Sequence, residues 1–343
     1  MSVTPAPHER GADPVHADDW HPVAASASLV PGTIVPTRLL GTELAVWRDA
    51  GGRAHAWEDR CPHRGLRFSC GVAHGDGVVC GYHGWTFDAQ GHCVHVPAHP
   101  GVRPSARACA RTFEVRERYG LVWACLGAPA RDVVPFPEYD DARLRKVLCG
   151  PYDVACSGPR IVENFLDMPH FAFVHAGILG DAAHAQVEAG KVLERDDAGP
   201  QVSGCLAWQP RSNALSLEGS DVEYTYRVVR PLTAILTKFP RAQPEFREAI
   251  SLHVQPLGEE SSRAWIVLAM TNFEDTDEDL RAFQDTIFLQ DQPIVENQVP
   301  RRLPLAPDAE VSMACDRMSL AYRRYLVREG LRYGVVPAGE GGA

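Results

Sequence analysis

Two short stretches of this sequence, CPHRG and CGYHGW, each place a cysteine and a histidine close together. Cys61 and His63 have one residue between them, and Cys80 and His83 have two. Thiolates and imidazoles bind soft and intermediate metal ions, and the glycines in both stretches allow tight loops around a bulky group. The pattern indicates a metal centre; the alternative is four ordinary residues of a small β-domain.

The order of these ligands distinguishes between kinds of metal centre. A tetrahedral zinc site also uses two cysteines and two histidines, but zinc fingers usually separate the cysteine pair from the histidine pair. Here each loop supplies one of each, which suits a two-iron cluster with two thiolates on one iron and two imidazoles on the other, the Rieske arrangement. Neutral imidazoles make such a cluster less negative and raise its reduction potential. Zinc and a purely structural role remain as alternatives.

Length, patterning and charge limit the classes of protein to consider. The 343 residues are enough for two medium domains, and no apolar run approaches the roughly 20 residues of a membrane span. Residues 1–19, expected to be a flexible lead, lack the pattern of a signal peptide. A cytoplasmic location is therefore expected, where the ten cysteines are thiols or metal ligands. The net charge of −10 argues against nucleic acid as the partner.

Hydrophobic patterning divides the chain into two domains. Residues 20–145 contain short alternating runs separated by turn residues, which predicts an all-β domain that ends in a proline-rich stretch. In residues 146–343, β-like runs at 186–195, 201–208, 213–229, 232–239 and 248–272 precede a helical pattern whose start is marked by acidic residues at 275–279. A last helix is expected to end at Gly330. An antiparallel sheet with helices on one side makes the second domain, and the chain, α+β.

Charge is distributed unevenly between these regions. Residues 51–120 contain nine arginines, no lysine and six acidic residues, so they carry +3 while the rest carries −13. A locally basic domain on an acidic chain suits docking of an acidic redox partner, although a solvated mixed surface explains the same counts.

A second group of candidate ligands lies in ENFLDMPHFAFVH, which supplies Asn164, Asp167, His170 and His175. The first three share one helical face, whereas the spacing of five between the histidines is wrong for a regular helix. A distortion or helix end after His170, where Pro169 already disturbs the helix, would bring both imidazoles to one metal. Two histidines and a carboxylate form the facial triad of non-haem Fe(II) oxygenases.

The carboxylate of that triad must come from elsewhere in the chain. Asp291 lies in a largely apolar part of an expected helix, where an inward-facing carboxylate needs a partner such as a metal. Asp285, six residues earlier, is the rival, and spacing alone does not decide between them.

The two motifs together carry a resemblance that covers about residues 20–335. The chain resembles the oxygenase α-subunits of Rieske non-haem iron oxygenases, whose motifs C-x-H-x16-C-x2-H and N-x2-D-x2-H-x4-H both occur here. It looks most similar to the short monooxygenase and demethylase branch, in particular to saxitoxin-pathway hydroxylases and methylxanthine N-demethylases. The resemblance implies a Rieske [2Fe-2S] domain followed by a helix-grip-like catalytic domain. Gly81 departs from the family, which usually has proline there.

The resemblance also implies roles for individual residues. Asp291 would be the third iron ligand with His170 and His175, because the family places this ligand in a helix with a similar pattern. These enzymes are typically head-to-tail trimers, so Asp167 would connect its own His170 to His83 of a neighbouring subunit for electron transfer. Asn164 would support the iron from close by.

The expected activity follows from this resemblance. Electrons from NAD(P)H would pass through a separate flavin reductase, with or without a ferredoxin, to the cluster and then to the mononuclear iron. One oxygen atom from O2 would enter a small aromatic, heterocyclic or alkaloid-like substrate, by C–H hydroxylation or oxidative O- or N-demethylation. Alternatives are a ring cis-dihydroxylating dioxygenase and a Rieske electron carrier without oxygenase activity. Candidate pocket residues are Trp208, Phe239, Trp265, Phe283 and Ile287.

Overall fold

A computed structural model describes residues 13–213, 215–216 and 218–339. They form two compact units that divide between Val133 and Val134. Residues 134–145, with the short helix α2 (Pro137–Asp140), therefore group with the second unit, although the sequence pattern placed them with the first. No helix in this described part of the chain combines the length and apolarity needed to cross a membrane.

The expected flexible lead is only partly covered by the structure. Residues 1–12 lie outside the described residues. The Asp13 carboxylate accepts the N–H of Val15 at 3.0 Å and so caps helix α1 (Pro14–Ala17), in which His16 is buried. A helix of one turn has little periodicity, so the sequence pattern does not predict it.

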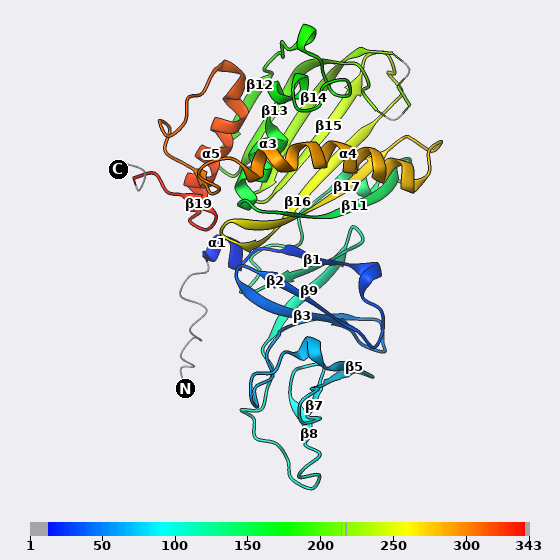
Figure 1. The fold of residues 1–343 in the computed structure, drawn as a ribbon, viewed down its shortest axis with the longest axis vertical. Coiled ribbons are helices and arrows are strands. Elements are labelled where there is room, and N and C mark those ends of the chain that lie inside the picture. The colour runs from blue at the N-terminus through cyan, green and yellow to red at the C-terminus, as the bar shows by residue number, and fades with distance from the viewer. Residues whose placement is uncertain (1–12, 214, 217, 340–343) are drawn as a thin grey trace. The chain divides into compact units, whose positions relative to one another are not determined.

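The first unit consists of two antiparallel sheets (Figure 1). The larger sheet has, in spatial order, β1 (His21–Ala25), β10 (Leu121–Cys125), β9 (Thr112–Arg118), β4 (Ala54–Glu58), β3 (Thr42–Arg48) and β2 (Ile34–Leu39). The smaller sheet has β5 (Val72–His74), β6 (Gly77–Val79), β7 (Thr86–Asp88) and β8 (Cys93–His95). The two cysteine–histidine stretches are the loops that precede and follow β5 and β6.

A row of aromatic rings forms the core beside these loops. Trp47 meets Trp57 edge-on, Trp57 meets Phe68, and Phe68 meets Phe87, with ring centroids 5.1 to 5.3 Å apart. All four side chains are at most 1% exposed, and Cys61 belongs to the same cluster. Burial of one such ring stabilises the fold by about 1.5–3 kcal/mol, so the loops rest on a fully buried and stabilising aromatic core.

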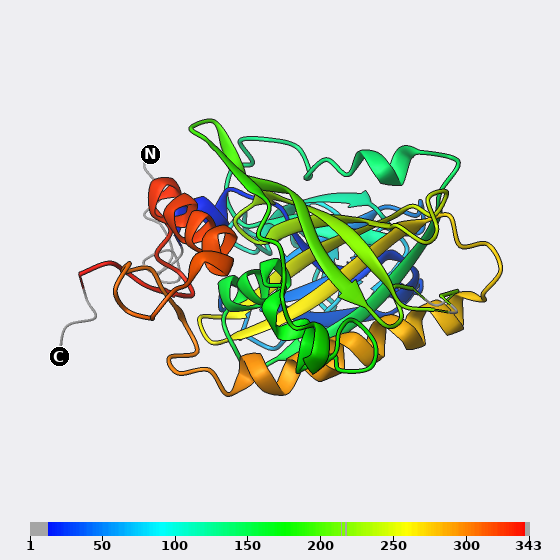
Figure 2. The same cartoon turned by 90° about the horizontal axis from the view of Figure 1, so that it is seen from above.

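The second unit contains one seven-stranded antiparallel sheet. Its strands are, in spatial order, β11 (Arg145–Val154), β17 (Ser261–Met270), β16 (Glu248–Gly258), β15 (Thr233–Pro240), β14 (Ser220–Arg230), β13 (Ala198–Gln209) and β12 (Lys191–Arg195). Helices α3 (Gly158–Leu166) and α4 (Asp277–Glu296) cross one face of it (Figures 1 and 2), and α5 (Arg317–Glu329) packs on β12 and β13. Two-residue strands β18 (Leu303–Pro304) and β19 (Val335–Val336) pair in parallel.

The long helix α4 begins where its sequence predicts. The Thr276 hydroxyl accepts the N–H of Asp279, and the Asp279 carboxylate accepts the N–H of Thr276, so the two residues form a capping box. Acidic residues fill the first turn, where the positive end of the helix dipole favours them. Helix α5 ends at Gly330 as predicted, with that glycine in the left-handed region at φ 77°. The predicted α+β class is confirmed.

Candidate active site: two metal centres

The two cysteine–histidine loops of the first unit have the same backbone design. The N–H of Gly65 donates to the carbonyl of Cys61 at 2.9 Å, and the N–H of Gly84 donates to that of Cys80 at 3.0 Å. Gly65 and Gly84 both lie in the left-handed region, at φ 74° and 67°, which glycine adopts without strain. Each loop therefore turns back on itself and holds its cysteine at a fixed position.

The four candidate ligands form two matched pairs. Cys61 and Cys80 are each 2% exposed; burial raises the pKa of the Cys61 thiol to about 11, and the neighbouring Cys80 adds to this. The rings of His63 and His83 lie 4.5 Å apart. Within the described residues, the buried His63 Nδ1 has no hydrogen-bond partner. Two adjacent thiols and two adjacent imidazoles, one with an orphaned nitrogen, fit the ligand set of a Rieske cluster.

Aromatic rings cover the imidazoles of this site. Trp85 stacks on His63 with ring centroids 4.3 Å apart and planes within 6°. The Tyr82 ring lies 3.8 Å from that of His83, and Tyr82 is 60% exposed. The histidine side of the site therefore faces solvent behind a thin aromatic cover, while the thiol side faces the core.

The structure gives a local reason for glycine at position 81. A Cβ atom on Gly81 would lie 2.4 Å from the carbonyl oxygen of Cys70, a backbone atom that cannot move aside cheaply. A Cβ atom on Gly71 would in turn lie 2.3 Å from the carbonyl oxygen of Val79. The chain at 70–71 thus packs directly on the second loop, and this close approach favours glycine where the family usually has proline.

In the second unit, helix α3 ends just before the candidate iron ligands. It stops at Leu166, Asp167 is extended, and a 3-10 turn follows at Pro169–Ala172. The histidine spacing predicted a helix end after His170, but the helix ends four residues earlier. Because the backbone of Asp167 is already extended, Asp167 and His170 do not share a helical face with Asn164. The Asp167 carboxylate accepts the N–H of His170 at 3.2 Å and lies 2.7 Å from its Nδ1, so it holds the backbone and the ring together.

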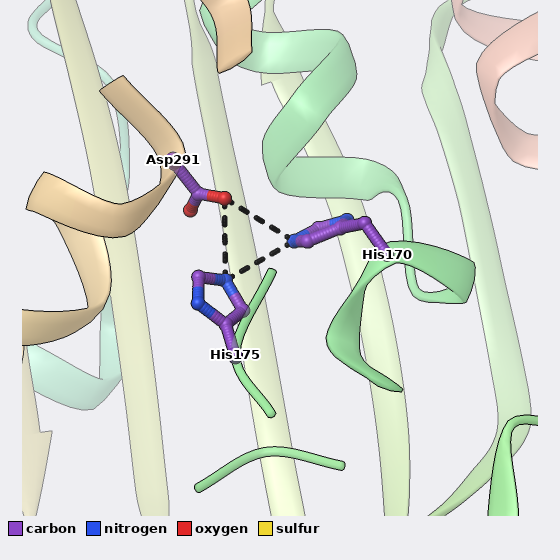
Figure 3. Close-up of side chains that lie close together, drawn as sticks. All are labelled: His170, His175 and Asp291. Atoms are coloured by element: carbon purple, nitrogen blue, oxygen red, sulfur yellow. Dashed lines mark hydrogen bonds and ion pairs between the residues drawn. The ribbon is translucent and has the colours of Figure 1, made fainter. Parts of the chain in front are cut away.

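His170, His175 and Asp291 converge on one point from three elements (Figure 3). The two Nε2 atoms lie 3.2 Å apart, and Asp291 Oδ1 lies 3.4 Å from that of His170 and 3.2 Å from that of His175. Metal bonds of about 2.0–2.2 Å at angles of about 90–110° place neighbouring ligand atoms about 3–3.5 Å apart. The donor set therefore fits a single mononuclear metal, and two histidines with one carboxylate favour non-haem iron.

Each ligand of this triad is oriented by a second residue. Gln290 Oε1 lies 2.8 Å from His175 Nδ1, which fixes Nε2 as the nitrogen that faces the centre. Burial alone lowers the pKa of His175, but the adjacent carboxylate of Asp291 outweighs it and raises the pKa. The amide of Asn164 donates to Asp291 Oδ1 at 3.5 Å. Nothing in the residue spacing predicted the contact between Gln290 and His175.

The rival carboxylate has a different partner. Asp285 accepts the hydroxyl proton of Tyr152 at 2.5 Å, from strand β11. Burial, and then the hydrogen bond to Asp285, raise the pKa of Tyr152. Asp285 therefore joins α4 to the sheet, and Asp291 is the carboxylate that faces the histidines.

The triad opens onto a cavity of about 980 Å³, including its mouth, between α3, α4 and the sheet. Of the predicted pocket residues, Phe283 and Ile287 line it, whereas Trp208, Phe239 and Trp265 do not. Strand side chains alternate between faces. The sheet residues that line the cavity are Tyr224, Tyr226, Leu236, Lys238, Glu248, Ile250, Leu252, Ile266, Leu268 and Met270, all even-numbered. Phe239 and Trp265 are odd-numbered residues of the same strands, so their side chains point to the opposite face of the sheet.

Comparison with known proteins shows to which protein family this pair of sites belongs. Residues 19–108 match the model of the Rieske [2Fe-2S] domain, and residues 154–329 match that of the vanillate O-demethylase oxygenase C-terminal domain. The second match alone spans more than half of the chain. The chain belongs to the Rieske non-haem iron oxygenases.

This Rieske oxygenase is 35% identical to the probable methylxanthine N7-demethylase NdmC of Pseudomonas sp. (strain TJI-51), over 92% of the chain and 95% of that relative. It is 43% identical to the oxidoreductase NdmD of Pseudomonas putida over 37% of the chain, a stretch that covers 21% of NdmD. A solved structure of Pseudomonas putida CBB5 NdmA with caffeine superposes with a TM-score of 0.78 at 28% identity, over 91% of this chain and 90% of that one.

Family membership confirms the enzyme class that the motifs predict. The chain is an O2-dependent oxidoreductase, a Rieske monooxygenase that uses a [2Fe-2S] cluster, non-haem iron and electrons delivered through a separate reductase. The alternatives of a zinc protein and of a simple electron carrier are thereby excluded.

Proposed function

We propose that this Rieske oxygenase oxidises a methyl group or another C–H bond of a small heterocyclic substrate held in the cavity beside His170, His175 and Asp291. Bound there, Fe(II) supplies the activation of O2 and the oxidation of the substrate carbon. For an N- or O-methyl group the balance is substrate, O2, two electrons and two protons giving demethylated product, formaldehyde and water. The observation that carries the proposal is the convergence of the triad on the wall of a largely apolar cavity.

The protein's own residues position the reaction. Apolar side chains of the sheet and of α4, among them Ile287, Phe288 and Leu268, line the cavity and exclude water from it. Gln290 and Asp167 hold the outer nitrogens of the two histidines, so both rings keep one orientation towards the metal.

The cluster ligands that we assign are Cys61, His63, Cys80 and His83. The two thiols lie side by side against the aromatic core, and the two imidazoles lie side by side towards solvent. A Rieske cluster needs this separation, because one iron takes both thiolates and the other takes both imidazoles.

We further propose that electrons enter the iron site from the cluster of a neighbouring copy through Asp167. Its Oδ2 contacts the His170 ring, and within the described residues its Oδ1 makes no hydrogen bond, while the side chain is 28% exposed. His83 is also exposed. An exposed carboxylate oxygen and an exposed imidazole are complementary, which supports a homotrimer in which one subunit's His83 meets the next subunit's Asp167. We also propose that a flavin reductase, with or without a ferredoxin, delivers the electrons to the cluster, and that the enzyme is located in the cytoplasm.

Oxygen uptake and formaldehyde release test the activity, with a flavin reductase and NADH present and a panel of N-methyl and O-methyl heterocycles as substrates. The proposal expects one formaldehyde for each O2 consumed with at least one compound. Formation of cis-diols from unmethylated rings would contradict it, and so would uncoupled oxygen consumption with every compound of the panel.

The variant Asp167→Asn tests the electron route. We expect both metals to remain bound, because the asparagine side chain has the same size and packs in the same place, but turnover supported by the reductase to be nearly abolished. Metal analysis and single-turnover reduction of the iron site measure the two effects separately. Asp181→Asn is the matched control, because Asp181 also contacts a histidine three residues later but lies outside the triad. Full activity of Asp167→Asn would refute the route.

A further inference from the structure

The charged side chains of the cavity's sheet wall lie in one row. Tyr224, Lys238, Glu248 and Met270 are directly opposite one another on four neighbouring strands, β14 to β17. On the same face, the adjacent row contains Tyr226, Leu236, Ile250 and Leu268, and the row beyond it contains Leu252 and Ile266. All ten line the cavity. An apolar wall therefore ends in a single lysine–glutamate pair.

This pair has unused hydrogen-bonding capacity. Lys238 Nζ forms an ion pair with Glu248 Oε2 at 2.5 Å and donates a hydrogen bond to the carbonyl of Ser212 at 2.9 Å, whereas the geometry of the ion pair gives Oε2 no hydrogen bond. Lys238 therefore keeps at least one of its three protons for a ligand. Within the described residues, Glu248 accepts from no other group. The two side chains are only 5% and 9% exposed. A buried ion pair is compensated only when its remaining protons and lone pairs find partners, so a ligand in the cavity gains by supplying them.

The pair lies at the end of the cavity away from Asp291. Met270, in the same row, pairs with Arg145, whose guanidinium binds Asp277 at the start of α4. The cavity follows α4 from Leu280 to Asp291, and eleven residues of helix rise about 16 Å. A molecule anchored at Lys238 and Glu248 therefore extends along the apolar wall with its other end towards the triad.

We propose that Lys238 and Glu248 recognise a neutral polar edge of the substrate in which an N–H stands beside a C=O, as in a lactam, imide or cyclic urea. Lys238 donates its remaining proton to the carbonyl, and Glu248 accepts the N–H. The pair is neutral in sum, so it supplies no net charge to compensate a substrate carboxylate or ammonium, whose burial in the cavity is therefore unfavourable. This inference rests on the proposed function, since it takes the cavity to be the substrate site.

Matched ligands test the recognition without turnover. The probes are 6-methoxyquinolin-2(1H)-one and its N-methyl analogue, titrated calorimetrically into the full-length holoenzyme without reductase or oxygen. Loss of a hydrogen bond to a charged group weakens binding about tenfold to a hundredfold, so we expect the N–H lactam to bind at least tenfold more tightly. Equal affinities would overturn the inference, as would failure of the lactam to bind at millimolar concentration. Tighter binding of 6-methoxyquinoline-2-carboxylate or of the 2-aminomethyl analogue would also overturn it.

The double variant Lys238→Met/Glu248→Leu separates recognition from the bulk of the added methyl group. Apolar residues of similar size often replace a buried ion pair without loss of stability, so the fold should persist. We expect the preference for the N–H lactam to disappear; a retained preference would assign it to other residues. The control Asp153→Asn/Arg263→Gln removes another cross-strand ion pair, at 2.6 Å and outside the cavity, and should leave the preference unchanged.

The variant Asp291→Ala distinguishes this inference from the proposed function. It removes an iron ligand at the far end of the cavity, so oxygen consumption should stop while the lactam preference remains. If the wild type binds the lactam selectively but oxidises no substrate, the recognition stands and the proposed reaction fails. If it oxidises substrates that lack an N–H beside a C=O as readily as those that have one, the recognition fails and the reaction stands.

Discussion

The two candidate metal centres of this chain are built in opposite ways. The cluster loops lie within 25 residues of each other, each closes its own turn, and both rest on one aromatic core. The iron triad takes His170 from the 3-10 turn after α3, His175 from the loop that follows and Asp291 from α4, more than 110 residues further along the chain. The first site is local to a small subdomain, whereas the second exists only when the whole second unit is folded.

This difference locates the weak point of each site. In the cluster loops, position depends on backbone turns and on close approaches that allow no Cβ atom. In the iron triad, position depends on side chains that are oriented by other side chains, such as Gln290 on His175. Backbone substitutions should therefore damage the first site most, and single side-chain substitutions the second.

The largest effect is expected for Asp291→Ala. Removal of the only carboxylate of the triad should strip the mononuclear iron and abolish oxygen consumption, while the visible spectrum of the cluster remains. Asp285→Ala is the control on the same helix: it loses the bond to Tyr152 but should retain the iron. Iron analysis and absorption spectra measure both. Loss of iron from Asp285→Ala with retention in Asp291→Ala would make Asp285 the ligand instead.

Gly81→Ala should damage the cluster site through the backbone. The new Cβ atom would meet the Cys70 carbonyl at 2.4 Å, and overpacking of this kind typically costs about 1–3 kcal/mol. We expect reduced cluster content with unchanged mononuclear iron. Gly101→Ala serves as the control, because a methyl group on that glycine would have no atom within 4 Å and its φ is not positive. Equal cluster content in both variants would contradict the close approach at Cys70.

Gln290→Leu should weaken the iron site without destroying it. Residues that orient a metal-binding histidine typically change metal affinity about tenfold to a hundredfold, and leucine removes the acceptor at His175 Nδ1 with little change in volume. Iron titration of the apoprotein measures the change. The matched control is Gln292→Leu, which loses bonds to the Asp153 carbonyl and to Glu296 on another side of α4. A similar loss of affinity in both would mean that Gln290 acts only by stabilising the helix.

The contrast between the sites also explains how far the sequence could predict them. Cys61, His63, Cys80 and His83 are readable because their spacing within two loops is itself the signature. The spacing of five residues between the histidines and the nearby proline predicted that the helix ends in this segment, but placed its end after His170 rather than at Leu166. Spacing could not choose between Asp285 and Asp291, because that choice depends on which side of α4 faces Tyr152.

Strand register is the part of the fold that spacing leaves undetermined. The sequence predicted β-like runs at the positions of β14 to β17, but joined β16 and β17 into one, and so missed the turn after Gly258. Without that turn, Glu248 has no assigned neighbour, and its position opposite Lys238 is invisible. Spacing also leaves open which face of a strand lines the pocket. Phe239 and Trp265 were named as pocket candidates, although the pleat turns them to the other side of the sheet.

The smallest effect is expected at the surface of the first unit, for Glu117→Gln. Glu117 pairs with Arg48 at 2.7 Å across the larger sheet, and an exposed pair of this kind contributes about 0–1 kcal/mol. The hydrogen bond from Arg48 lowers the pKa of Glu117. The contribution of Glu117 to the free energy of unfolding is therefore fully present above its unfolded pKa of about 4.3, and it is lost as the pH falls through the lower pKa of the folded state. Chemical denaturation at pH 7 and pH 3 should show a slightly less stable variant at pH 7 and a smaller difference at pH 3. If the substitution lowered the free energy of unfolding at pH 7 by well above about 1 kcal/mol, the first unit, like the iron site, would depend on pairs of side chains.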